Sequence, residues 1–366
     1  MASSLASSAC IAPRAVAFRV RGRVTHRPAR AVQTRAATYD EVFDGVSGQM
    51  VPVLSQSVES LSAGGLDWSY RLGVPEDDVE QQPNTVVLVH GAGMLSYTYS
   101  KLMKELQMKG YTCVAPDMPG HGASSKPSPS SFKYDLKAYQ SALSDFVNAL
   151  NVTMEDDMID LVVSGFFTSQ GALLFAAANP DKVRRVVVLN APLGNGHKLP
   201  DPLGVYGRPF GMGKGANADV YKLAYFGNEF AIPAERMEVY EAPYVGGEAA
   251  AARDAFEATA TSVSPKDAMQ SVTDAFSKRG STPPPKLRVV WGASDKYLND
   301  APMYKWCDDV RASFDVMRKV GHMPHEDFAE ETAKFVASFL QSEGKVGALK
   351  SVRLGKIGKD DDYDRN

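Results

Sequence analysis

Four short motifs carry the residue types that acid–base chemistry needs. They hold His90 in VVLVHGAG, Asp117 and His121 in APDMPGHGASSKP, Asp295 in WGASD, and His322 in VGHMPHED. A histidine can take up a proton near neutral pH. An aspartate held against its ring fixes the tautomer and stabilises the imidazolium. The sequence therefore contains carboxylate and imidazole groups from which a proton-transferring pair can be formed.

These motifs follow short apolar runs that alternate with helical segments. Runs such as TVVLVHG (85–91) and RRVVVLN (184–190) are bounded by glycine or polar residues, as buried parallel strands are. A helical stretch near 96–109 ends before Gly110, in the position where glycine commonly terminates a helix. The alternation predicts an α/β protein with a doubly wound, mostly parallel sheet.

The alternation stops between residues 194 and 282. This segment is rich in Gly, Ala, Tyr and Pro, and it contains helical stretches such as EAAAARDAFEAT without a clear strand. We interpret it as a helical cap inserted into a core of residues 55–193 and 283–341, because PPPKLRVVWGASD resumes the strand pattern. Residues 342–366 are basic and then acidic, which is typical of a disordered tail.

The N-terminal segment 1–37 differs from the rest in composition. Its first 36 residues contain seven arginines, several Ser and Ala, and no Asp, Glu or Lys, which is typical of a transit peptide. The opening MASSLASSAC and the RAAT that ends at Thr38 favour a chloroplast, with a mitochondrion as the alternative. A nucleic-acid-binding arm is a further interpretation. Losing the seven arginines takes the formal net charge from −3 to −10, which disfavours nucleic-acid binding by the mature protein.

Composition sets further limits on function. Hydrophobic residues make up 44% and charged residues 23% of the chain, as in ordinary soluble globular proteins. No apolar run approaches the roughly 20 residues of a transmembrane helix. The wide spacing of Cys10, Cys113 and Cys307 supports neither a disulfide framework nor a zinc site. The sequence predicts no metal or organic cofactor and leaves the oligomeric state open.

In their order and spacing, the four motifs resemble those of the α/β-hydrolase superfamily over roughly residues 55–341. The resemblance is greatest to the branch of haloalkane dehalogenases and epoxide hydrolases, through its plastid-targeted plant and algal members. It implies an α/β-hydrolase fold with Asp295 as the triad acid and His322 as the general base, in the family's chain order. It also places Ala92 and Phe167 at the oxyanion-hole positions.

For the other histidines of these motifs we expect no catalytic role. We interpret His90 and His121 as hydrogen-bonded turn residues without a catalytic role. His325, the rival of His322, follows Pro324 at the start of the last helix, where we expect it to be exposed.

The nucleophile position departs from the family pattern. The family elbow is a strand, then glycine–x–nucleophile–x–glycine, then a helix, with small flanking residues because the turn is strained. Aligned on the downstream ALLFAAANPDKV, the nucleophile slot falls on Phe166, which cannot attack a substrate. An alternative register, FTSQG at 167–171, nominates Ser169 but needs a longer strand and puts bulky Phe167 where the turn is most crowded. We favour Phe166 and keep Ser169 as the alternative.

The pocket composition bears on the substrate. By resemblance, dehalogenases carry a halide-binding side chain and a tryptophan where this chain has Ala92 and Phe167, so dehalogenation is disfavoured. Phe166, Phe167, Met94 and Met323 predict an apolar cavity. In the cap, Tyr240 and Tyr244 either supply hydroxyls to that cavity or pack within the cap.

Two functional hypotheses follow. In the first, the Asp295–His322 dyad acts as a general base on water or on a substrate C–H or O–H, without covalent catalysis, and the substrate is a small apolar ester, epoxide or carbonyl compound. Ser169 at the elbow would instead give a serine esterase. In the second, the fold is a non-catalytic scaffold that binds a small ligand or a protein partner.

Overall fold

The computed structural model describes residues 36–44, 48–152, 157–207, 219–228, 230–247 and 249–342. All but the last two residues of the predicted transit peptide, and all but the first residue of the expected tail, lie outside these ranges. Among the described residues, no helix is long and apolar enough to cross a membrane.

An eight-stranded sheet forms the centre of the fold, in the order β10-β9-β8-β7-β5-β6-β4-β3. Neighbouring strands from β10 to β6 are parallel, whereas β4 pairs antiparallel with both β6 and β3. The predicted α/β class and mostly parallel sheet are confirmed. The strands are β3 Ser57–Ala63, β4 Leu66–Gly73, β5 Val86–Val89, β6 Cys113–Pro116, β7 Ile159–Ser164, β8 Val183–Leu189, β9 Lys286–Gly292 and β10 Ser313–Met317.

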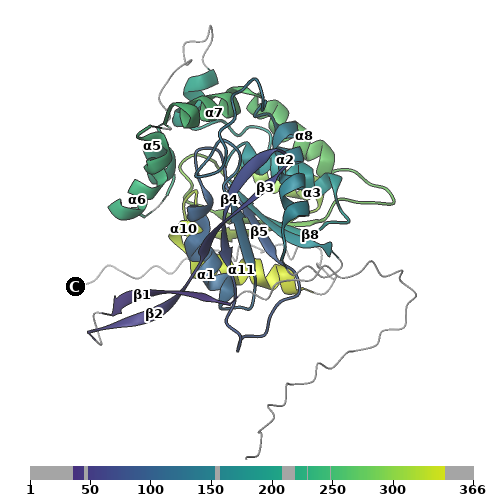
Figure 1. The fold of residues 1–366 in the computed structure, drawn as a ribbon. Coiled ribbons are helices and arrows are strands. Elements are labelled where there is room, and N and C mark those ends of the chain that lie inside the picture. Colours follow the sequence, from purple (N-terminus) through teal and green to yellow (C-terminus); the bar gives the residue numbers. More distant parts are fainter. Residues whose placement is uncertain are drawn as a thin grey trace, which may run out of the picture. The chain divides into compact units, whose positions relative to one another are not determined.

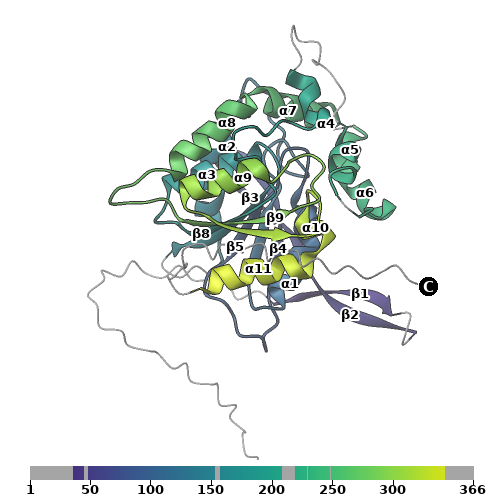
Figure 2. The ribbon, with the colours of Figure 1, turned by 180° about the vertical axis from the view of Figure 1, so that it is seen from behind.

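Successive side chains of the central strands enter two different apolar cores. In β5, Val87 and Val89 join one cluster while Val86 and Leu88 join the other, because side chains alternate along a strand. Figures 1 and 2 show α1 and α11 on one face of the sheet and α2 and α3 on the other. Burial on both faces explains the unbroken apolar runs. The core helices are α1 Ser100–Gln107, α2 Leu136–Ala149, α3 Thr168–Ala178, α9 Ala301–Val310, α10 Pro324–Asp327 and α11 Ala329–Gln341.

The segment interpreted as a cap lies between β8 and β9 and holds only helices among its described residues. Its helix α8 is capped by Ser264, whose hydroxyl accepts the Asp267 amide at 3.1 Å, and begins with Pro265. Figure 1 shows α5, α6 and α7 beyond one end of the sheet. The cap helices are α4 Asp201–Gly204, α5 Val220–Tyr225, α6 Ala234–Glu241, α7 Ala249–Thr261 and α8 Pro265–Phe276.

A two-stranded hairpin precedes the main sheet and has no counterpart in the sequence analysis. β1 (Thr38–Asp44) pairs antiparallel with β2 (Gln49–Ser55). Pro52 in the second strand argues against a central strand, but a two-stranded ribbon has only edge strands, where proline is tolerated.

Candidate active site

A sharp turn joins β7 to α3 at the centre of the sheet. The strand ends at Ser164 and the helix begins at Thr168, with left-handed backbone at Gly165 (φ 74°) and Phe167 (φ 59°). A Cβ added to Gly91 would lie 2.6 Å from the Phe166 nitrogen, so the two turns pack backbone against backbone. The sequence supplies glycine where this approach is closest, whereas Phe167 holds a strained conformation.

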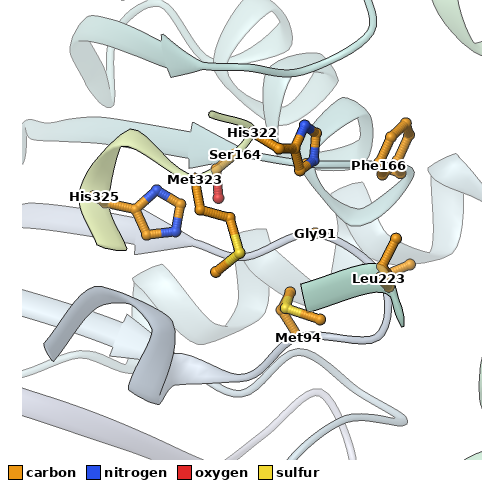
Figure 3. Close-up of a pocket in the computed structure, with 10 residues that line it drawn as sticks. Gly91, Met94, Ser164, Phe166, Leu223, His322, Met323 and His325 are labelled. Atoms are coloured by element: carbon orange, nitrogen blue, oxygen red, sulfur yellow. The ribbon is translucent and has the colours of Figure 1, made fainter. Parts of the chain in front are cut away.

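Phe166 faces the imidazole of His322. The two rings stack with centroids 5.1 Å apart and planes 20° apart, and Figure 3 shows the two side chains next to each other. Ser169 instead lies in the first turn of α3, where its hydroxyl donates to the Gly165 carbonyl at 2.6 Å. An aromatic ring therefore stacks on His322, while the Ser169 hydroxyl is engaged by the backbone of the turn.

Asp295 and His322 form a hydrogen-bonded pair. His322 Nδ1–H donates to Asp295 Oδ2 at 2.8 Å, and the carboxylate is fully buried. The same carboxylate accepts the Asn190 amide at 2.8 Å and the backbone amides of Tyr297 (2.7 Å) and Leu298 (3.0 Å). Because a carboxylate with these donors only accepts, the proton stays on Nδ1 and Nε2 is left as an acceptor.

The oxyanion-hole prediction requires a correction. The Ala92 amide donates to the Phe166 carbonyl at 2.8 Å, as does the Thr168 amide at 2.8 Å. The Thr168 hydroxyl also donates to the His90 carbonyl. Because the Phe166 carbonyl turns toward the 91–92 loop, the Ala92 N–H is not free to stabilise an oxyanion. Phe167 is buried and does not line the pocket.

A small cavity lies beside the dyad. Its free space is about 20 Å³, enough for about one water molecule. Met94 and Met323 line it as predicted, together with Leu223 of the cap helix α5 (Figure 3). The remaining lining residues are Gly91, Ala92, Ser164, Gly165, Phe166, His322 and His325.

The cap tyrosines do not line this cavity. The Tyr240 hydroxyl donates to Glu326 Oε2 at 3.0 Å, and Tyr244 packs edge-on against Phe256. Glu326 also accepts two hydrogen bonds from Arg236 of α6, at 2.6 and 2.5 Å. Tyr240 thus links cap helix α6 to α10 of the core, Tyr244 packs within the cap, and the predicted role of both in the pocket is corrected.

Four histidines besides His322 are buried among the described residues, namely His90, His121, His197 and His325. His90 Nδ1–H donates to the Gly91 carbonyl at 2.8 Å and Nε2 accepts the Met118 amide at 3.0 Å, which fits the structural interpretation. Burial lowers the pKa of His90 to about 4 and that of His121 to about 3. The expectation of an exposed His325 is wrong: this side chain is 1% exposed and lines the cavity, because Thr98 and Tyr99 cover it.

A short cap segment holds the loop that carries the histidine, and the sequence analysis missed it. The Gly227 carbonyl accepts the His322 amide at 2.7 Å, and Asn228 Oδ1 accepts the Met323 amide at 3.0 Å. Lys296, which follows Asp295 in the chain, donates to the Asn228 carbonyl at 3.0 Å. The cap therefore contacts the loops of both dyad residues, which a single sequence does not reveal because the partners are far apart in the chain.

Replacing Gly227 by alanine is expected to displace the dyad histidine. The new Cβ would lie 2.6 Å from the Tyr297 ring and 2.9 Å from His322 Cβ. We expect a loss of about 1–3 kcal/mol in unfolding free energy from overpacking, together with a clear fall in any His322-dependent activity. The matched control is G247A in the same cap, where the added Cβ meets nothing within 4 Å. Equal stability and activity in the two variants would contradict this prediction.

The fold and site define a class: a mostly parallel sheet with helices on both faces, a sharp turn after a central strand, and an aspartate–histidine pair. Residues 86–335 match the model of the Alpha/beta hydrolase family. The chain therefore belongs to the α/β hydrolase family.

Curated relatives and solved structures agree with this assignment. Cis-3-alkyl-4-alkyloxetan-2-one decarboxylase of Shewanella oneidensis is 35% identical over 111 residues, 30% of this chain and 33% of that protein. Haloalkane dehalogenase 1 of Mycobacterium tuberculosis is 26% identical over 264 residues, covering 70% and 84% of the two chains. The structure of haloalkane dehalogenase DbeA from Bradyrhizobium elkani has a TM-score of 0.63 at 18% identity, over 78% of this chain and 97% of that one. This likeness shows the shared fold.

Proposed function

We propose that this protein is a plastid hydrolase in which His322, supported by Asp295, acts as a general base on water. The observation that carries the proposal is the hydrogen bonding of the Asp295 carboxylate, which accepts from His322, Asn190 and two backbone amides. This arrangement fixes the tautomer that leaves Nε2 free to take a proton and stabilises the imidazolium that results. The plastid location rests on the composition of residues 1–37.

The pocket supports a small apolar substrate, which we propose to be an ester, an epoxide or a carbonyl compound. Met94, Leu223 and Met323 are among its apolar lining residues. The names of the relatives refer to haloalkanes and to an alkyl-substituted oxetanone. Dehalogenation itself is not proposed, because Ala92 and Phe167 stand where the resemblance implies halide-binding side chains.

The second candidate is a non-catalytic scaffold that binds a ligand or a protein partner. Two observations favour it: the Ala92 amide is engaged by the Phe166 carbonyl, and the cavity has about 20 Å³ of free space. Acyl transfer usually depends on free donors at the developing oxyanion. Without them, the fold can persist for binding alone.

A rapid-mixing experiment separates these functions. The purified protein is mixed with p-nitrophenyl acetate, p-nitrophenyl butyrate and an epoxide, and product is followed from the first milliseconds. Direct attack by water predicts steady turnover of at least one substrate without an initial burst, because no acyl-enzyme accumulates. A burst equal to the enzyme concentration would show a covalent nucleophile instead. Turnover no faster than buffer on every substrate would favour the scaffold.

A further inference from the structure

Cap helix α6 meets the core at a buried carboxylate, Glu326 of α10. Arg236 donates to it from Nε to Oε1 at 2.6 Å and from Nη2 to Oε2 at 2.5 Å. Tyr240 donates to Oε2 at 3.0 Å, and Lys101 Nζ lies 2.7 Å from Oε1. The Glu326 side chain is 2% exposed. Although burial acts to raise it, the hydrogen bonds from Arg236 and Lys101 bring the pKa of Glu326 below its ordinary value, so the carboxylate is ionised.

The guanidinium of Arg236 is fixed by more than this carboxylate. Its Nη1 donates to the Tyr97 hydroxyl at 2.9 Å and its Nη2 to Ser100 Oγ at 3.2 Å, and the group lies 4.4 Å from the centre of the Tyr97 ring. A bidentate arginine specifies both the distance and the angle of a carboxylate, which a lysine does not. The contact therefore defines the position of α6 against the core more narrowly than apolar packing would.

Glu326 belongs to the same hydrogen-bonded stretch of backbone as the dyad histidine. The Met323 carbonyl accepts the amides of Glu326 and Asp327, both at 2.9 Å, and Asp327 Oδ2 accepts the Gly321 amide at 2.8 Å. His322 lies between these bonded residues, four positions before Glu326. A displacement of Glu326 is therefore transmitted to the imidazole through a short, internally bonded stretch.

The cap holds this stretch at a second point. The Gly227 carbonyl accepts the His322 amide, and Asn228 Oδ1 accepts the Met323 amide. Asn228 also donates to the Ala224 carbonyl at 2.6 Å, which connects the same contact to α5. Residues that follow α5 thus hold the stretch where it carries the histidine, and α6 holds it at its other end.

Stability alone does not explain the buried ion pair, because apolar residues of similar size are often an equal or better replacement. We propose that Arg236 and Glu326 are positioning residues, through which the cap sets the place of the His322 imidazole against Asp295. This inference rests on the proposed function of His322 as a general base. A misplacement of about 1 Å can lower the rate of such a positioned reaction by about 100-fold.

Kinetics on the ester panel test the role of the pair. R236K keeps the charge but loses the bidentate contact, and E326Q keeps the size but loses the carboxylate. We expect both to lower kcat by about 10- to 100-fold with KM changed less than about threefold. R288K is the matched control, because Arg288 donates to Asp315 at 2.5 Å between β9 and β10, away from the cavity lining. It should keep the wild-type kcat. Wild-type kcat in R236K and E326Q as well would overturn the proposal.

A triple variant separates positioning from stability. R236M/Y240F/E326L replaces the polar groups with apolar side chains of similar size, so that neither a buried charge nor the Tyr240 hydroxyl is left unpaired. We expect its unfolding free energy in urea to recover toward the wild-type value, whereas kcat stays as low as in R236K. Recovery of kcat together with stability would show that the cluster only stabilises the fold, which would also overturn the proposal.

The dyad hydrogen bond can be observed without turnover. The His322 Nδ1–H proton, bonded to Asp295 at 2.8 Å, gives a proton NMR resonance far downfield that is assigned by its loss in H322Q. We expect this resonance in the wild type and R288K, and a shifted or broadened one in R236K and E326Q. If it changes as expected but no substrate turns over, the positioning role stands and the proposed function fails. If activity depends on His322 but the resonance and kcat are unchanged in both variants, the function stands and this inference fails.

Discussion

Replacing His322 by alanine is expected to lower kcat on the ester or epoxide panel by about 10²- to 10⁴-fold, the usual contribution of a positioned general base. His322 is the dyad residue whose Nε2 remains an acceptor beside the cavity, since Nδ1 is committed to Asp295 at 2.8 Å. Without the imidazole, water must lose its proton to solvent. We expect KM to change much less than kcat, because the apolar lining remains. Steady-state kinetics of the purified variant measures both.

Another buried histidine, His197, provides the control for this substitution. His197 stacks on Trp291 and contacts the Asn299 carbonyl at 2.8 Å, away from the cavity lining. H197Q should therefore keep kcat within a few-fold of the wild type. The single variant D295N should lose activity as H322A does, because the amide of the new asparagine no longer fixes the imidazole tautomer. Full activity in H322A would exclude the dyad mechanism.

Mild acid is expected to unfold the protein, because three buried histidines must stay neutral. Burial lowers the pKa of His90 to about 4 and those of His121 and His325 to about 3, from an ordinary value of 6.5. The unfolded chain therefore binds more protons between these values. The stabilisation from keeping these histidines neutral is fully present above pH 6.5. It is lost as the pH falls toward their pKa values in the folded protein. At pH 4.5 each of these histidines lowers the free energy of unfolding by about 2–3 kcal/mol. The combined loss from all three is comparable with a typical total stability of about 5–15 kcal/mol.

Urea unfolding followed by circular dichroism at several pH values between 7.5 and 4.5 measures this effect. The slope near pH 5 should correspond to about three protons taken up on unfolding. H121F provides the control, because His121 Nε2 has no partner among the described residues and its Nδ1 contacts only the Pro119 carbonyl. This variant should lower the slope by about one third. Constant unfolding free energy from pH 6.5 to 4.5 would contradict the prediction.

Local sequence signals were sufficient for the fold and for the two dyad residues. The unbroken apolar runs predict strands buried on both faces, and β5 confirms this with side chains in both cores. Asp295 and His322 each lie in a short continuous motif that follows a strand, so each position can be found without knowledge of its partner. The turn after β7 places Phe166 against His322 because the strand ends at Ser164.

Long-range contacts account for what the sequence did not reveal. Asn190 reaches Asp295 from another strand, and Asn228 holds the Met323 amide from the cap. Neither contact leaves a pattern in a single sequence. The sequence does not predict the burial of His325 because Thr98 and Tyr99, which cover it, lie more than 200 positions away in the chain.

The state of the Ala92 amide was equally hidden from the sequence. It depends on the direction of one carbonyl, that of Phe166, and residue types do not encode a peptide orientation. The same holds for the cap tyrosines, because the partner of Tyr240 is a glutamate of α10.

Labelling with a fluorophosphonate probe, followed by peptide mass spectrometry, tests most directly whether an aromatic ring stands where the family has its nucleophile. We expect no labelled peptide from residues 159–178 of the wild type under conditions that label a serine esterase completely. We expect a label at position 166 in F166S that is lost when H322A is added. A label on Ser169 of the wild-type protein would show that Ser169, not an aromatic ring, serves this position.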